Sequence, residues 1–97
     1  MIRKNKDTPD ITFLDPFDKQ LKNAPDEIQE AFADTLELFL EDPHHPQLRN
    51  HELREKFAGL RSIDVTGDWR AVFKETQSGK QKVIKFYVIG THKELYG

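Results

Sequence analysis

Histidine and tyrosine side chains at two places in the sequence are suited to acid–base chemistry. His92 and Tyr96 follow the last apolar segment and lie four residues apart, so one helical turn over residues 91–96 would place imidazole and phenol on the same side. His51 lies in a polar segment nearer the middle of the chain. Because the unperturbed imidazole pKa is about 6.5, either histidine can act as a general base or acid near neutral pH. The alternative is that His92 and Tyr96 form a surface tail packed against a sheet.

Other polar clusters in the sequence do not predict a metal site. His44 and His45 are adjacent in a proline-containing loop, but adjacent side chains seldom point at one centre. Four carboxylates share one face of an expected helix that carries no histidine, which favours a solvated acidic surface: those of Glu30, Asp34, Glu37 and Glu41. Cysteine is absent, which excludes disulfides and thiolate ligands and fits a cytoplasmic location. We expect neither a metal ion nor a small-molecule cofactor.

Two helices are expected in the first half of the chain, after a short strand at residues 11–14. Asp15 is suited to cap the first helix and Pro16 to occupy its first position. The second helix is expected from Pro25 to Glu41, where apolar residues recur at helical spacing. Its apolar stripe consists of Ile28, Ala31, Phe32, Thr35, Leu36 and Phe39.

Three strands are expected in the second half of the chain, at residues 60–65, 69–74 and 83–89. The first two alternate apolar and polar residues, and the third is rich in β-branched and aromatic residues. Residues 76–80 predict a polar turn between the last two. The expected fold is therefore α+β, with two N-terminal helices packed on a small, mainly antiparallel four-stranded sheet.

The register of the first of these hairpins follows from its hydrophobic pattern. A three-residue loop at 66–68 would pair Val65 with Trp69 and Asp64 with Arg70, which keeps one face apolar. The apolar face would hold Ile63, Val65, Trp69, Ala71, Phe73, Ile84, Phe86 and Val88. The open face would hold Ser62, Asp64, Arg70, Lys85 and Tyr87.

The composition predicts a single small domain over residues 1–97. The chain has 36% hydrophobic and 33% charged residues, with no apolar run of membrane-spanning length and no secretory signal at Met1. Residues 1–10 are polar and are expected to form a flexible arm. The prediction excludes a membrane partner.

Charge is distributed unevenly along the chain. The net charge of −2 argues against a nucleic-acid partner. However, residues 1–42 hold five Lys and Arg against eleven Asp and Glu, whereas residues 43–97 hold ten against six. The second half could thus present a basic face to phosphate groups, although small domains also show such imbalances by chance.

Three segments, in this order, carry a resemblance to a known family. They are His51-Glu52-Leu53, Gly67-Asp68-Trp69-Arg70, and the tail from Ile89 to Tyr96. Together they resemble the RelE/ParE superfamily of type II toxins, nearest its YafQ-type mRNA interferases. The resemblance covers nearly the whole chain. It implies a metal-independent, ribosome-dependent endoribonuclease that cuts mRNA and is held inactive by a cognate antitoxin protein.

The resemblance assigns catalytic roles to five residues. His51 matches the loop histidine of YafQ-type toxins, Asp68 the hairpin aspartate and His92 the terminal histidine. Tyr96 matches the final aromatic residue, and Arg70 matches an arginine that RelE and YoeB-type members place beside the scissile phosphate.

Two positions depart from the YafQ-type pattern. Asp64 stands where those toxins have another histidine, and Val88 stands where they have an arginine. Arg70 could replace the lost cation. Asp64 opposite Arg70 could equally form a plain cross-strand ion pair.

RNA cleavage without a metal needs a base, an acid and a cation that stabilises the charge on phosphorus. His51 and His92 would be the acid–base pair, and either of them could be the base. Arg70 would be the cation. Asp68 could orient a histidine or contact a base, and Tyr96 could stack on an unpaired base. Further expected RNA-binding residues are Arg49, Arg54, Lys56, Arg61, Asp64, Lys85, Tyr87 and Lys93.

The sequence is also compatible with two other functions. A ParE-like toxin would share the fold but inhibit DNA gyrase through protein contacts, without using the two histidines. A non-catalytic or decayed RelE-fold module would be non-toxic and could still bind an antitoxin.

Overall fold

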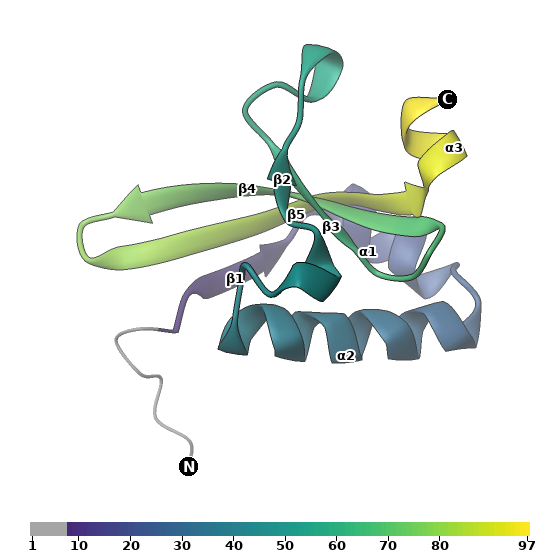
Figure 1. The fold of residues 1–97 in the computed structure, drawn as a ribbon, viewed down its shortest axis with the longest axis horizontal. Coiled ribbons are helices and arrows are strands. Elements are labelled where there is room, and N and C mark those ends of the chain that lie inside the picture. The colour runs from purple at the N-terminus through teal and green to yellow at the C-terminus, as the bar shows by residue number, and fades with distance from the viewer. Residues whose placement is uncertain (1–7) are drawn as a thin grey trace.

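The computed structural model describes residues 8–97, which are organised around one long β-hairpin (Figure 1). Strands β4 (Trp69–Ser78) and β5 (Gln81–Thr91) pair antiparallel along their whole length. The residues expected as a turn at 76–80 are mostly strand, because backbone pairing continues from Ser78 to Gln81. Gly79 then makes a tight two-residue turn at a φ of 61°, which suits glycine.

Within residues 8–97, the sheet has five strands in the order β1-β5-β4-β3-β2, one more than predicted. β1 (Asp10–Phe13) is parallel to β5, whereas β3 (Arg61–Asp64) and β2 (His51–Glu52) continue the sheet antiparallel beside β4. β2 is the strand that the sequence did not predict, since two residues are too few to show alternation.

The predicted register of the β3–β4 hairpin is confirmed. Asp64 pairs with Arg70, and the Val65 N–H donates to the Trp69 carbonyl at 2.8 Å. The loop of residues 66–68 therefore has the predicted length.

Helices α1 (Asp15–Lys22) and α2 (Asp26–Glu41) cover one face of the sheet (Figure 1). The start of α1 and both ends of α2 agree with the prediction to within one residue. Leu14 is the N-cap of α1, so Asp15 is the first helical residue rather than the cap. Pro25 likewise caps α2 instead of occupying its first position.

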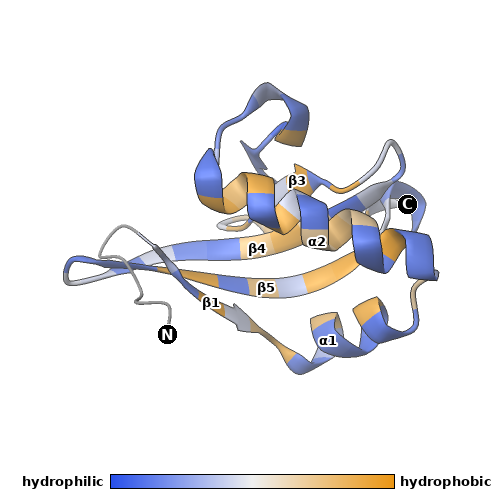
Figure 2. Cartoon of the chain, turned by 90° about the horizontal axis from the view of Figure 1, so that it is seen from below, coloured by the Kyte–Doolittle hydropathy of each residue, from blue (hydrophilic) through white to orange (hydrophobic). Residues whose placement is uncertain are grey.

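The core between helices and sheet is built mainly from phenylalanine. The Phe86 ring centroid in β5 lies within 6.2 Å of five other phenylalanine rings: Phe13, Phe17, Phe32, Phe39 and Phe73. Figure 2 shows hydrophobic segments of β4 and β5 beside α2, while the far end of the hairpin is hydrophilic. The helices therefore fix the half of the hairpin that carries the C-terminal tail.

The prediction that Val88 lies on the helix-covered face of the sheet is wrong, because β5 contains a β-bulge. Val72 pairs with Val88, but the next residue of β4 pairs with Phe86, which leaves Tyr87 as the extra residue. Val88 consequently lies on the open face instead of the helix-covered face, and Ile89, which is 2% exposed, takes the predicted core position.

A flexible arm is expected at residues 1–10. Residues 1–7 of it lie outside the described residues, and Asp10 is the first residue of β1. None of the helices in residues 8–97 is long and apolar enough to cross a membrane. The same range contains no group of three or more His, Cys, Asp and Glu side chains that could hold a metal ion.

Candidate functional site

The sheet face opposite α1 and α2 carries a row of paired residues from four strands. His51 pairs with Ser62, Ser62 with Val72, and Val72 with Val88. Directly paired residues of antiparallel strands point to the same face, so these side chains form one line across the sheet. The segment between β2 and β3 and the C-terminal helix α3 (His92–Tyr96) both rise on this face (Figure 1).

Tyr96 lies over the centre of this row. Its hydroxyl donates to Ser62 Oγ at 3.3 Å, and its ring meets the edge of Phe57, in the 3₁₀ helix η2 (Glu55–Phe57), at 5.7 Å between centroids. Ser62 and Val72 are fully buried, although they face away from the two long helices. The tail is thus anchored on the sheet, which the sequence alone could not settle.

His92 is held beside Tyr96 by the start of α3. The two ring centroids are 4.8 Å apart, which confirms the predicted one-turn arrangement. Thr91 and Glu94 form a capping box: the Thr91 N–H donates to Glu94 Oε1 at 2.8 Å, and the Glu94 N–H donates to Thr91 Oγ1 at 3.1 Å. The His92 N–H donates to the Asp68 carbonyl at 2.8 Å.

This cap also affects a titratable group. The backbone hydrogen bond from Thr91, followed by the one involving its hydroxyl group, lowers the pKa of the Glu94 carboxyl below its ordinary value. The ionised form of Glu94 is therefore the one that supports α3.

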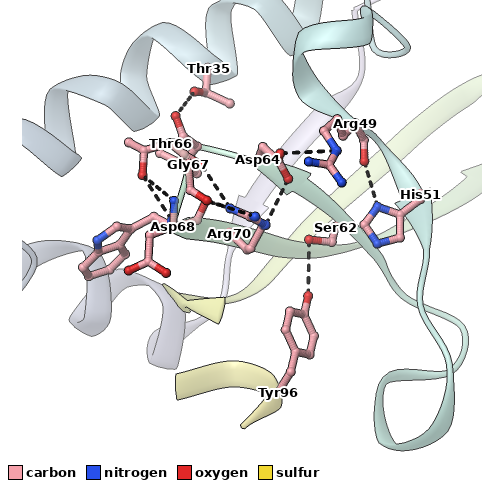
Figure 3. A network of polar contacts seen from close by, with 12 residues as sticks. Thr35, Arg49, His51, Ser62, Asp64, Thr66, Gly67, Asp68, Arg70 and Tyr96 are labelled. Atoms are coloured by element: carbon pink, nitrogen blue, oxygen red, sulfur yellow. Dashed lines mark hydrogen bonds and ion pairs between the residues drawn. The ribbon is translucent and has the colours of Figure 1, made fainter. Parts of the chain in front are cut away.

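His51 lies at the exposed end of the same row, in β2. Its Nδ1 is 2.7 Å from the carbonyl oxygen of Arg49 (Figure 3). A carbonyl can only accept, so the proton is on Nδ1, and the neutral ring has its free lone pair on Nε2. His51 thus adjoins Ser62 in the sheet, while His92 adjoins Tyr96, and the Tyr96–Ser62 hydrogen bond connects the two sides.

Arg70 is largely occupied by contacts within its own hairpin (Figure 3). Its Nε lies 3.0 Å from Asp64 Oδ1, and its side chain is only 13% exposed. Nη1 donates to the carbonyls of Thr66 and Trp69, and Nη2 donates to that of Gly67, at 3.0, 3.1 and 3.2 Å. This geometry favours a structural role, holding the 66–68 loop, over the phosphate contact that the resemblance implies.

Asp68 lies in this loop, next to α3. Its side chain is exposed, and within residues 8–97 its carboxylate makes no hydrogen bond or ion pair. It contacts His92 through its backbone carbonyl, not through its carboxylate. The structure therefore does not bring the Asp68 carboxylate to either imidazole as an orienting group.

The predicted RNA-binding residues divide into two groups. Exposed side chains are those of Arg49, Arg54, Lys56, Lys85 and Lys93. Arg61 and Tyr87 are half-buried, and the Asp64 side chain is largely buried. Arg61 Nε donates to Asn50 Oδ1 at 2.8 Å, and Asp64 pairs with two arginines.

Sequence reasoning missed Lys74 and the role of Ser62. Lys74 is exposed and is the direct partner of Lys85 across the hairpin, and its position in the alternation of residues 69–74 could have indicated this. Ser62 gave no signal, because its buried contact with Tyr96 depends on how the tail folds back.

In the described part of the chain, two hollows are lined by neither His51 nor His92. One of them, of about 410 Å³, lies between α2 and the 65–67 loop and is lined by Thr35, Leu48 and Gly67, among others. A second one, of about 320 Å³, lies between α1 and α3 beside Trp69. Small-molecule substrates are usually held in such cavities. The open face with its two histidines is better suited to an extended partner.

This architecture, with two N-terminal helices packed on one face of a mainly antiparallel sheet, is that of the RelE/ParE toxin superfamily. Residues 11–96 match the family model described as the ParE toxin of the type II toxin-antitoxin system, parDE. The chain therefore belongs to this family of toxins.

Solved structures share the fold over nearly the whole chain. YafQ from E. coli strain BL21(DE3) is 24% identical with a TM-score of 0.75, and the match covers 92% of this chain and 99% of YafQ. A YoeB/ParE toxin from Agrobacterium tumefaciens is 15% identical with a TM-score of 0.69, covering 86% and 98%. No curated protein matches the chain in sequence.

Proposed function

We propose that this type II toxin is a ribosome-dependent mRNA endoribonuclease, acting in the cytoplasm as a single domain without a metal ion. The observation that carries the proposal is that the Tyr96–Ser62 hydrogen bond joins the neighbours of two imidazoles: Ser62 is the strand partner of His51, and the Tyr96 ring lies 4.8 Å from that of His92. Within residues 8–97, the two hollows described above are lined by neither histidine, which is consistent with a polymeric substrate.

In the proposed reaction, His51 Nε2 takes the proton from a ribose 2′-OH, and the resulting oxygen attacks the adjacent phosphorus. The bond from phosphorus to the 5′ oxygen breaks, and His92 protonates that leaving oxygen. The products are a 2′,3′-cyclic phosphate and a 5′-hydroxyl end. The hydrogen bond from His51 Nδ1 to the Arg49 carbonyl supports His51 as the base, since it leaves Nε2 free.

The proposed protein partner is a cognate antitoxin. Two of the structurally similar proteins were solved as complexes, DinJ-YafQ from E. coli and RelBE2 from Mycobacterium tuberculosis. By analogy, an antitoxin would hold this chain inactive until it is removed, and the ribosome and mRNA would then be its partners.

Inducible expression in a bacterial host, followed by primer-extension mapping of an abundant transcript, tests this function. We expect growth arrest and cuts within translated codons. His51→Ala and His92→Ala should each reduce cleavage by about 10² to 10⁴, the usual contribution of a general acid or base. Cleavage at the wild-type rate in either variant contradicts the assignment.

The second candidate function is inhibition of DNA gyrase, which is favoured by the match to the ParE family model. Growth arrest with a DNA-damage response and uncut transcripts would support it. A protein that causes no arrest but still binds an antitoxin would instead be a non-catalytic module.

A further inference from the structure

We propose that Arg49, rather than Arg70, supplies the cation that binds the scissile phosphate beside His51. The inference rests on the proposed ribonuclease function and names the residue that would carry the charge. Arg49 has a positive φ, and its guanidinium group is far more exposed than that of Arg70, although both contact Asp64.

Arg49, two residues before His51 of β2 and at the C-terminal end of the 3₁₀ helix η1 (Pro46–Leu48), adopts a left-handed conformation with φ 49° and ψ 44°. Long side chains are uncommon in this region, where glycine is free of strain. The turn presents the Arg49 carbonyl to His51 Nδ1 at 2.7 Å, a contact that glycine would make equally well. The turn and its carbonyl contact with His51 therefore do not require an arginine at position 49. The presence of arginine there points to a function of its side chain.

The Arg49 side chain is available for a ligand. It is 74% exposed, and its Nε lies 3.7 Å from Asp64 Oδ2, a long contact of the kind that contributes little at a surface. A phosphate group, with charge-assisted and bidentate hydrogen bonds, would readily replace it. Arg70 by contrast is 13% exposed and already has four acceptors.

Asp64 fits this division of roles. Its carboxylate lies between the two arginines, so the group of three has a net charge of +1 (Figure 3). Arg70 neutralises Asp64 inside the hairpin, and Arg49 is left as the net positive charge next to His51. An aspartate is thereby compatible with a phosphate-binding face.

The test compares Arg49→Gly, Arg49→Lys and Glu55→Gly in the purified full chain. The substrate is a short mRNA on 70S ribosomes. Arg49→Gly removes the charge while relieving the backbone, so we expect cleavage to fall about 10- to 100-fold without a lower melting temperature. Arg49→Lys should retain cleavage to within about tenfold. Glu55, the first residue of η2, has a φ of 58°, so Glu55→Gly gives the same backbone relief without removing a cation and should cut normally.

Binding to the programmed ribosomes at several salt concentrations separates this inference from the proposed function. Arg49→Gly should lower the slope of log affinity against log salt by about one. Wild-type cleavage by Arg49→Gly, or an equal loss in Glu55→Gly, overturns the inference and leaves the ribonuclease intact. If the wild type cuts no mRNA, the proposed function fails, and an unchanged salt slope in Arg49→Gly overturns the inference as well.

Discussion

At the scale of single residues, two arginines that share Asp64 differ in what they are free to do. Arg70 could be predicted to lie opposite Asp64, because the hairpin register follows from alternation. Its bonds to the backbone carbonyls of Thr66, Gly67 and Trp69 could not be predicted, since they depend on the exact path of the loop. The resemblance alone would make Arg70 the phosphate ligand.

Arg70→Ala should lower the free energy of unfolding by about 3 kcal/mol, because it leaves a largely buried Asp64 carboxylate without its main partner. Urea denaturation measures the effect. Arg70→Lys should fall between this variant and the wild type, since it keeps the charge but loses the planar fork. A variant Arg70→Ala of normal stability that no longer cuts RNA would instead make Arg70 a catalytic residue.

The hydrogen bond from Tyr96 to Ser62 is the second prediction at this scale. Tyr96→Phe should cost about 1 kcal/mol of stability, because the fully buried Ser62 hydroxyl loses its donor. The double variant with Ser62→Ala should cost less than the sum of the two single changes. Strictly additive free energies from thermal or urea unfolding would show that the two hydroxyl groups are not coupled.

At the scale of elements, the α3 cap positions both His92 and Tyr96. Because the folded-state pKa of Glu94 is lowered, its ionised carboxylate stabilises the fold above the unfolded-state pKa of about 4.3. This contribution is lost as the pH falls through the lower, folded-state pKa.

Glu94→Gln should accordingly be less stable than the wild type at pH 7, and the difference should shrink as the pH falls below about 4. Urea titrations across this pH range measure it, with the exposed Glu37→Gln of α2 as a control for the loss of one carboxylate. A difference that stays constant over the whole range would contradict the role of the ionised cap.

Elements were predictable where the signal is local. The stripe of α2, the length of the 66–68 loop and the turn that pairs His92 with Tyr96 all follow from spacing within a few residues. The two-residue strand β2 and the bulge at Tyr87 do not, because both are defined by pairing with a distant strand. The bulge in turn moved Val88 to the open face.

At the scale of the whole molecule, basic side chains follow the open face beyond the histidine row. Lys74 and Lys85 are directly opposed across β4 and β5, and neither has an ion-pair partner within residues 8–97. Opposed like charges destabilise a sheet, so this pair favours a bound phosphate backbone. Lys82, three positions before Lys85, alternates to the other face and pairs with Glu75 at 3.9 Å.

The double variant Lys74→Gln with Lys85→Gln should weaken binding to programmed ribosomes and lower the salt slope by about two. Its stability should be unchanged or slightly higher, because a repulsion is removed. Lys82→Gln is the matched control on the same hairpin and should bind normally. An equal loss of binding in this control would show that binding depends only on the net charge of the protein. It would contradict a path for RNA along Lys74 and Lys85.

The central claim, that a histidine-assisted 2′-OH attacks the phosphate, is tested most directly by one measurement. Ribosomes carrying an mRNA with a single 2′-deoxy nucleotide at the mapped cut site are treated with the purified protein, beside the all-RNA control. We predict that the control is cut to a 2′,3′-cyclic phosphate and that the deoxy mRNA stays intact at that position. Cleavage of the deoxy mRNA there would contradict the mechanism, because no 2′-OH would be present for His51 to deprotonate.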